Sequence, residues 1–170
     1  MFQKGEYVIY GSKGVFEVLD ITTVQQEGIP ADRLYYLLHP LNVKENKVFT
    51  PVENRKTIMR PLITRQEAER LISEMPHIEE LSIPSEKARE QVYKDTLKTG
   101  DCREYIRIIK TLYRRKKARV ANGKKITTTD ERYLKQAEDA LYSEFAVLFS
   151  VSKEEIPQVI DERLKAAQAV

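Results

Sequence analysis

The side chains in this sequence with the clearest chemical potential are basic, and they lie between positions 101 and 135. This segment holds 12 basic and 4 acidic residues, a net charge of +8, whereas residues 136–170 have a net charge of −4. Clustered Lys and Arg side chains bind phosphate oxygens, so nucleic acid is the leading class of partner. An acidic protein surface is the rival partner, and a solvated basic face that binds nothing is the third interpretation.

Residue types that support catalysis or metal binding show no matching pattern. His39 and His77 are far apart, and neither has a cysteine or carboxylate at a ligand spacing. Cys102 lies at an expected helix start, where the helix dipole lowers the pKa of a thiol, but a small packed residue is the simpler interpretation. No glycine-rich loop of a phosphate-cradling kind is present. We therefore expect no enzyme, no metal, no cofactor and no small-molecule substrate.

One amphipathic helix, Asp101 to Val120, is expected to position the basic cluster. Tyr105, Ile106, Ile109, Leu112 and Tyr113 recur at three- and four-residue steps, so they share the side of the helix that faces a core. Asp101 is expected to cap the first turn, with Glu104 completing a capping box. The remaining surface presents a cationic rail to polyanions, made of Arg103, Arg107, Lys110, Arg114, Arg115, Lys116, Lys117 and Arg119.

The chain around this helix has two kinds of pattern. Before residue 62, five short segments rich in β-branched and aromatic residues predict a small β-barrel, namely residues 5–11, 14–24, 33–40, 46–52 and 56–61. After Pro61 every element is expected to be helical. Capping boxes predict helix starts at Thr64, Thr128 and Ser152, and Pro157 moves the last start two or three residues later. A further helix is expected from Ser85 to Lys98. The fold class is therefore α+β.

Composition is that of an ordinary globular protein. Hydrophobic residues make up 41% and charged residues 32% of the 170 residues. There is no apolar run of about 18 residues that could span a bilayer, and no secretory signal is visible at the start. Cys102 is the single cysteine, which fits a reducing compartment. We expect a cytoplasmic protein with no membrane partner.

Four motifs in register resemble the CarD/CdnL family of bacterial transcription regulators. The first is F-x-x-G-[DE]-x-V-x-Y-x-x-x-G, from Phe2 to Gly14, and the others are KVFTPVEN at 47–54, LKTGD at 97–101 and TLYRRKK at 111–117. The first segment is also similar to the polymerase-binding module of transcription-repair coupling factors. The basic helical half and the lack of a helicase motif favour the regulator.

The resemblance implies a Tudor/SH3-like barrel over residues 1–62 that binds the β subunit of RNA polymerase. It implies that residues 63–170 form a helical domain that contacts promoter DNA at the upstream edge of the melted bubble and stabilises the open complex. We expect a monomer, with polymerase contacts at Val24, Lys47 and Phe49; burial of Phe49 in an alternating strand is the alternative. The expected DNA-backbone contacts are Arg89, Lys94, Arg119 and Lys135, on exposed flanks of neighbouring helices, with Arg114 and Arg115 contributing.

The chain departs from the family at one place. Relatives commonly have a tryptophan before the LKTGD-like segment that wedges against a base at the fork, and this sequence has none. Ser82 or Glu86 stands near that position. Tyr93 is the candidate to replace the tryptophan, and burial of Tyr93 on the core-facing side of its amphipathic helix is the alternative. Two other functions stay open: a protein-binding adaptor without DNA contact, and an RNA- or ribosome-binding barrel protein.

Overall fold

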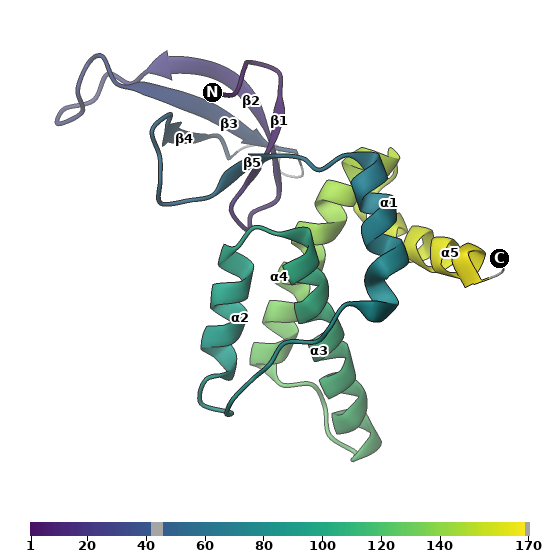
Figure 1. The fold of residues 1–170 in the computed structure, drawn as a ribbon. Coiled ribbons are helices and arrows are strands. Elements are labelled where there is room, and N and C mark those ends of the chain that lie inside the picture. Colours follow the sequence, from purple (N-terminus) through teal and green to yellow (C-terminus); the bar gives the residue numbers. More distant parts are fainter. Residues whose placement is uncertain (42–45, 169–170) are drawn as a thin grey trace. The chain divides into compact units, whose positions relative to one another are not determined.

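A computed structural model describes residues 1–41 and 46–168. The chain divides into two compact units, Met1–Leu62 and Ile63–Val170, which are coloured purple to blue and teal to yellow in Figure 1. The first unit contains the strands and the second contains the helices. The fold is therefore α+β, with an antiparallel sheet and a helical C-terminal region.

The first unit is built on a five-stranded antiparallel sheet. Its strands are β1 (Tyr7–Tyr10), β2 (Val15–Thr23), β3 (Leu34–Pro40), β4 (Val48–Pro51) and β5 (Met59–Pro61), each inside a predicted segment. Their order is β4-β3-β2-β1-β5. The expected barrel is not confirmed, because the described residues show no pairing that joins β4 to β5. Both outer strands are therefore sheet edges.

Alternating side chains on one face of this sheet pack into a single cluster, which comprises Val8, Tyr10, Phe16, Val18, Tyr36 and Leu38. On the other face, Ile9, Val15 and Tyr35 are buried too. The tight turn between β1 and β2 depends on Gly11, whose φ of 55° lies in the left-handed region. A Cβ atom there would also approach the side chain of Thr57 to 3.0 Å. These two constraints explain why glycine occupies the turn.

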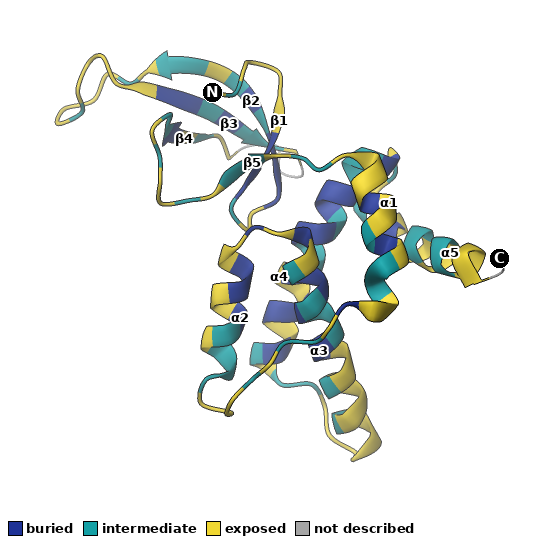
Figure 2. Ribbon diagram, in the orientation of Figure 1, coloured by how far each residue is buried: buried dark blue, intermediate teal, exposed yellow. Residues whose placement is uncertain are grey.

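The helical unit contains α1 (Arg65–Glu74), α2 (Arg89–Lys98), α3 (Cys102–Ala121), α4 (Thr128–Phe149) and α5 (Ile156–Gln168). Two 3₁₀ turns flank these helices: η1 (Met75–His77) follows α1 and η2 (Lys153–Glu155) leads into α5. Figure 2 shows the buried stripes of α2, α3 and α4. The core between them includes Tyr93, Tyr105, Ile108, Leu112, Leu141 and Phe145. No helix among the described residues has the length and the hydropathy needed to cross a membrane.

Caps explain where these helices begin. The predicted capping box of Thr64 and Glu67 is present, and Asp101 accepts a hydrogen bond from the Arg103 N–H at 2.8 Å. The Glu104 side chain instead binds Arg107, so it does not complete a box. Thr127, one residue earlier than predicted, caps α4. A 3₁₀ turn capped by Ser152 delays α5 to Ile156, as the position of Pro157 predicted.

Two sequence predictions about helices are wrong. The helix expected from Ser85 starts at Arg89, because residues 86–88 form a turn and the N-cap residue of α2, Ala88, has no capping side chain. Tyr113, expected in the core, is exposed, because Ile108 and Thr111 take the buried face of α3 with Tyr105 and Leu112. The buried stripe of α3 is therefore rotated from the one predicted.

Candidate functional site

The free edge of β4 is the first candidate site. The Val52 N–H donates to the Leu34 carbonyl at 3.0 Å, so residues 48, 50 and 52 direct their backbone groups toward β3. Because these directions alternate in an antiparallel ladder, the backbone groups of Lys47 and Phe49 point toward the free edge. Pro51 also points outward, but it has no N–H to donate. The edge therefore offers at most two hydrogen-bond donors, the N–H groups of Lys47 and Phe49, and Pro51 after them can only accept.

Two of the three predicted polymerase contacts lie at this edge. Phe49 is 52% exposed, so the alternative of a buried Phe49 is wrong, and Lys47 beside it is exposed too. Val24 follows the end of β2, which β3 separates from β4. The register pairs Thr23 with Leu34, so Val24 lies near the Val52 end of β4, away from Lys47. The structure thus groups Lys47 and Phe49 without Val24.

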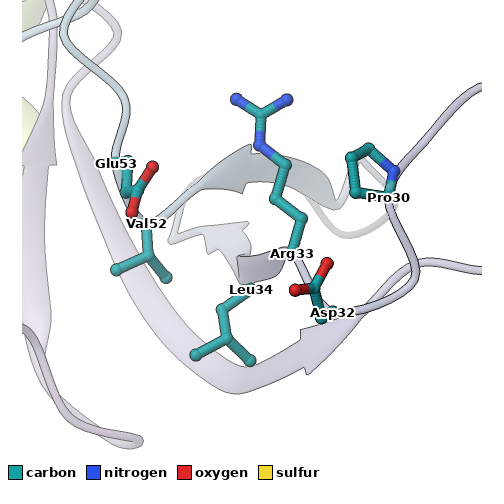
Figure 3. A pocket seen from close by; sticks show the side chains of 6 residues that line it. All are labelled: Pro30, Asp32, Arg33, Leu34, Val52 and Glu53. Carbon is teal, nitrogen blue, oxygen red and sulfur yellow. The ribbon is translucent and has the colours of Figure 1, made fainter.

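A pocket of about 460 Å³ lies at the Val52 end of the edge. It is lined by Pro30, Asp32, Arg33, Leu34, Val52 and Glu53. Figure 3 shows Leu34 and Val52 next to each other, with the carboxylates of Glu53 and Asp32 on either side. The Arg33 guanidinium lies 5.6 Å from the centroid of the Tyr35 ring. The sequence did not predict this pocket because its residues come from two segments, 30–34 and 52–53, which the pairing of β3 with β4 brings together.

The cationic rail of α3 is largely bound by the helical unit itself. Arg103 pairs with Glu74, Arg107 with Glu104, and Arg114 with Glu80. Lys110 donates to the carbonyls of Met75 and Ile78, at 2.8 and 2.6 Å. Arg119 donates to the Lys125 carbonyl at 2.8 Å. These cations therefore have partners within the protein, which the charge count of the sequence did not indicate.

Five side chains from three segments form a closed ring of polar contacts. Arg115 Nε lies 2.7 Å from Asp130 Oδ2, and Asp130 Oδ1 accepts from the Tyr93 hydroxyl at 3.4 Å. That hydroxyl accepts from Arg89 Nη1 at 2.9 Å, and both arginines bind Glu86, which closes the ring. Asp130 is only 3% exposed. The ring ties the connector before α2 to α3 and α4.

Hydrogen bonds within the ring keep the Glu86 carboxylate ionised. Hydrogen bonds from Arg89 and then Arg115 lower the pKa of Glu86 from 4.5 to about 2. The hydrogen bond to Glu86 in turn raises the pKa of Arg89, against the effect of burial. Burial is the main reason why the pKa of Tyr93 is raised. Glu86 is therefore an anion throughout the physiological range.

Burial separates the predicted DNA contacts into two groups. Arg89 is 18% exposed, so it does not lie on an exposed flank as expected, and Arg115 is 25% exposed. Lys94, Arg114 and Lys135 are exposed, and Arg119 is half-buried. Lys94 lies 3.7 Å from Glu90, which also binds Arg132 of α4 at 2.9 Å. Lys135 follows Arg132 by three residues, on the same side of α4.

The aromatic residues give no wedge at the predicted position. Tyr93 is fully buried and packs against Tyr133 with ring centroids 5.4 Å apart, which confirms the core interpretation of this tyrosine. Ser82 and Glu86 are exposed but cannot stack on a base. No group of three or more histidine, cysteine, aspartate or glutamate residues in the described ranges could hold a metal ion.

Comparison with known families gives two matches that together cover most of the chain. Residues 2–63 match the family model described as "CarD-like/TRCF RID domain", and residues 77–161 match the one described as "CarD, C-terminal domain". The first match contains β4 and its edge, and the second contains the ring around Glu86. A search of curated proteins found no significant match.

Proposed function

Because the chain belongs to the CarD/CdnL family of RNA polymerase-interacting, transcription-related proteins, we propose that it binds the polymerase β subunit and contacts promoter DNA to stabilise the open complex. The observation that carries this proposal is the free edge of β4 with its exposed Phe49, inside the segment that matches a polymerase-interaction domain. The alternatives are an adaptor that never touches DNA and an RNA-binding barrel protein.

Strand addition is the proposed mode of polymerase binding. An extended segment of the β subunit pairs with the outward backbone groups of Lys47 and Phe49, and the Phe49 ring packs on its side chains. Val24 lies beyond the other end of the edge and supplies a secondary contact. A Tudor-like barrel is the proposed architecture of this unit.

The helical unit is proposed to contact the DNA backbone through Lys94, Arg114, Arg119 and Lys135, together with Arg89 and Arg115. Few phosphate contacts bind free DNA weakly at physiological salt. Attachment to the polymerase raises the effective concentration of these side chains at the promoter. Stronger contact with the melted promoter than with duplex shifts the equilibrium toward the open complex, so binding suffices without catalysis or a cofactor. The protein acts as a cytoplasmic monomer.

Polymerase binding is tested with two matched aromatic substitutions in the full chain. Phe49→Ala removes an exposed ring at the β4 edge, and Tyr7→Ala removes an exposed ring from β1, which is paired on both sides. We expect Phe49→Ala to weaken binding to purified β subunit about tenfold, on the scale of a truncated interface anchor, and Tyr7→Ala to leave it unchanged. Equal affinities for the two variants would contradict the assigned edge.

DNA contact is tested by the lifetime of the open complex on one promoter, with and without the protein. We expect the wild-type protein to lengthen it and the double variant Lys94→Ala, Lys135→Ala to do so less. A specific observation favours the adaptor: most cations of α3 already have partners in the protein. If polymerase binds normally but the lifetime is unaffected by the protein, the adaptor is the correct function.

A further inference from the structure

Two guanidinium groups in the helical unit converge on one exposed carboxylate. Arg89 Nη2 lies 2.8 Å and Arg115 Nη1 lies 3.3 Å from the same oxygen, Glu86 Oε1. The Glu86 side chain is 70% exposed, whereas both arginine side chains are largely covered. Glu86 precedes α2 and lies in a turn, so it is the member of the trio with the most freedom to move away.

Each arginine has a second contact that does not involve Glu86. Arg89 Nη1 donates to the Tyr93 hydroxyl, and Arg115 Nε binds the buried carboxylate of Asp130. The Tyr93 hydroxyl also donates to Asp130, which links the two arginines to one anchor. Departure of Glu86 would therefore leave both guanidinium groups oriented toward the same point. Two arginine side chains that are already held in place bind an anion well, because little side-chain entropy is lost on binding.

The charge of the group without Glu86 matches one phosphodiester. Arg89 and Arg115 contribute two positive charges, and Asp130 neutralises one of them. Guanidinium groups bind phosphate oxygens through paired N–H donors, in the same way that they bind a carboxylate. In this structure the Glu86 carboxylate oxygens occupy the place that phosphate oxygens would take.

We propose that Arg89 and Arg115 form a single phosphate-binding site and that Glu86 is an internal ligand which a DNA phosphate displaces. The proposal rests on the proposed contact with promoter DNA and deepens it: the two arginines act as one site, and Glu86 competes with DNA. Binding then also releases the end of the connector from α3, since Glu86 is its ionic link to Arg115.

The test compares two substitutions that remove the same charge. Glu86→Gln weakens the internal ligand, and Glu131→Gln is the control, because Glu131 is an exposed residue of α4 beside Asp130 with no side-chain partner among the described residues. Affinity for a short labelled duplex is measured by fluorescence anisotropy over a range of salt. We expect Glu86→Gln to bind about tenfold more tightly than wild type, with a salt slope steeper by about one unit.

The control variant should change affinity less than about twofold, because the Glu131 carboxylate is exposed and binds neither arginine of the site. Adding Arg89→Gln to Glu86→Gln should abolish the gain, since the site would lose one of its two guanidinium groups. Equal affinities and slopes for Glu86→Gln and Glu131→Gln would overturn the site, while wild-type binding to DNA would leave the proposed function standing.

Thermal unfolding in inorganic phosphate separates the site from the DNA function. At constant ionic strength, phosphate should raise the Tm of Glu86→Gln more than that of wild type or Glu131→Gln, because it binds the folded state. If this stabilisation occurs and no variant binds DNA, the phosphate site stands and the DNA contact fails. If phosphate stabilises all three proteins equally, the site is refuted by a measurement that involves no DNA.

Discussion

Arg114 and Arg115 are neighbours in sequence, yet replacing each by alanine should have different effects on stability. Arg115 binds Asp130, whose carboxylate is almost completely buried, whereas Arg114 is 79% exposed and binds Glu80 at the surface. Arg115→Ala leaves a buried carboxylate whose remaining side-chain contact in the ring is the Tyr93 hydroxyl at 3.4 Å. Arg114→Ala exposes nothing that was buried.

The magnitude follows from the burial of the pair. Removing one partner of a buried ion pair costs about 3–5 kcal/mol, because the other charge stays without compensation. Since Arg115 is a quarter exposed, water reaches part of the site and the lower end, about 3 kcal/mol, is expected. In urea this loss lowers the unfolding midpoint of the helical unit by about 1–3 M. Arg114→Ala should leave the midpoint unchanged, since exposed ion pairs contribute little.

Urea unfolding followed by circular dichroism at the helical band is the appropriate assay, because the chain has no tryptophan. Arg115→Ala, Asp130→Ala is the control: it removes both charges and should recover much of the stability lost in Arg115→Ala. If Arg115→Ala unfolds at the same urea concentration as Arg114→Ala, the ring around Asp130 does not stabilise the helical unit and the reasoning is refuted.

Three further outcomes are expected. Glu86 has a pKa of about 2 in the folded protein and about 4.5 when unfolded. Its contribution to stability is therefore complete above pH 4.5 and is lost as the pH falls toward 2. Urea unfolding of wild type and Glu86→Gln should show a smaller difference in stability at pH 3 than at pH 6. Lys94→Ala and Lys135→Ala should each reduce the slope of log affinity against log salt by about one unit on any DNA sequence, and unchanged slopes would show that these lysines do not contact phosphate. Ser82→Trp should lengthen the open-complex lifetime by about fivefold or more if a stacked ring at this connector reaches the fork, whereas an unaltered lifetime would exclude this position for a wedge.

The elements could be predicted from sequence because their signals are local. Alternation and glycine turns located all five strands, and capping residues such as Thr64 and Asp101 located helix starts within a few residues. The predicted start of α2 is too early because serine is a common N-cap residue, which made Ser85 a candidate. In the structure the Ser85 side chain binds the Ala88 N–H of the turn before α2. Closure of the sheet depends on contacts between distant strands, which no local pattern contains.

The candidate sites could be predicted only as groups of residue types. Charge counts located the basic segment correctly, but not the partners of its side chains. Arg103 and Arg114 bind Glu74 and Glu80, which lie 29 and 34 residues earlier in the chain. Such pairs form when the helices pack, so the freedom of a cation cannot be counted from sequence. Arg89 and Arg115 were both named as DNA contacts, but their common ligand, Glu86, becomes visible only in the structure.

Pro51 at the end of the β4 edge has a consequence for self-association. An exposed edge strand is a template for pairing with further copies of the same chain, and uninterrupted edges promote aggregation. Here the ladder can extend over two outward donors before Pro51, which shortens it for any partner strand. In a parallel, in-register pair of two copies, Lys47 would face the Lys47 of the other copy, and like charges directly opposite each other are destabilising. A foreign segment without a lysine at the facing position avoids this repulsion, so the edge favours a foreign strand over a second copy in that arrangement.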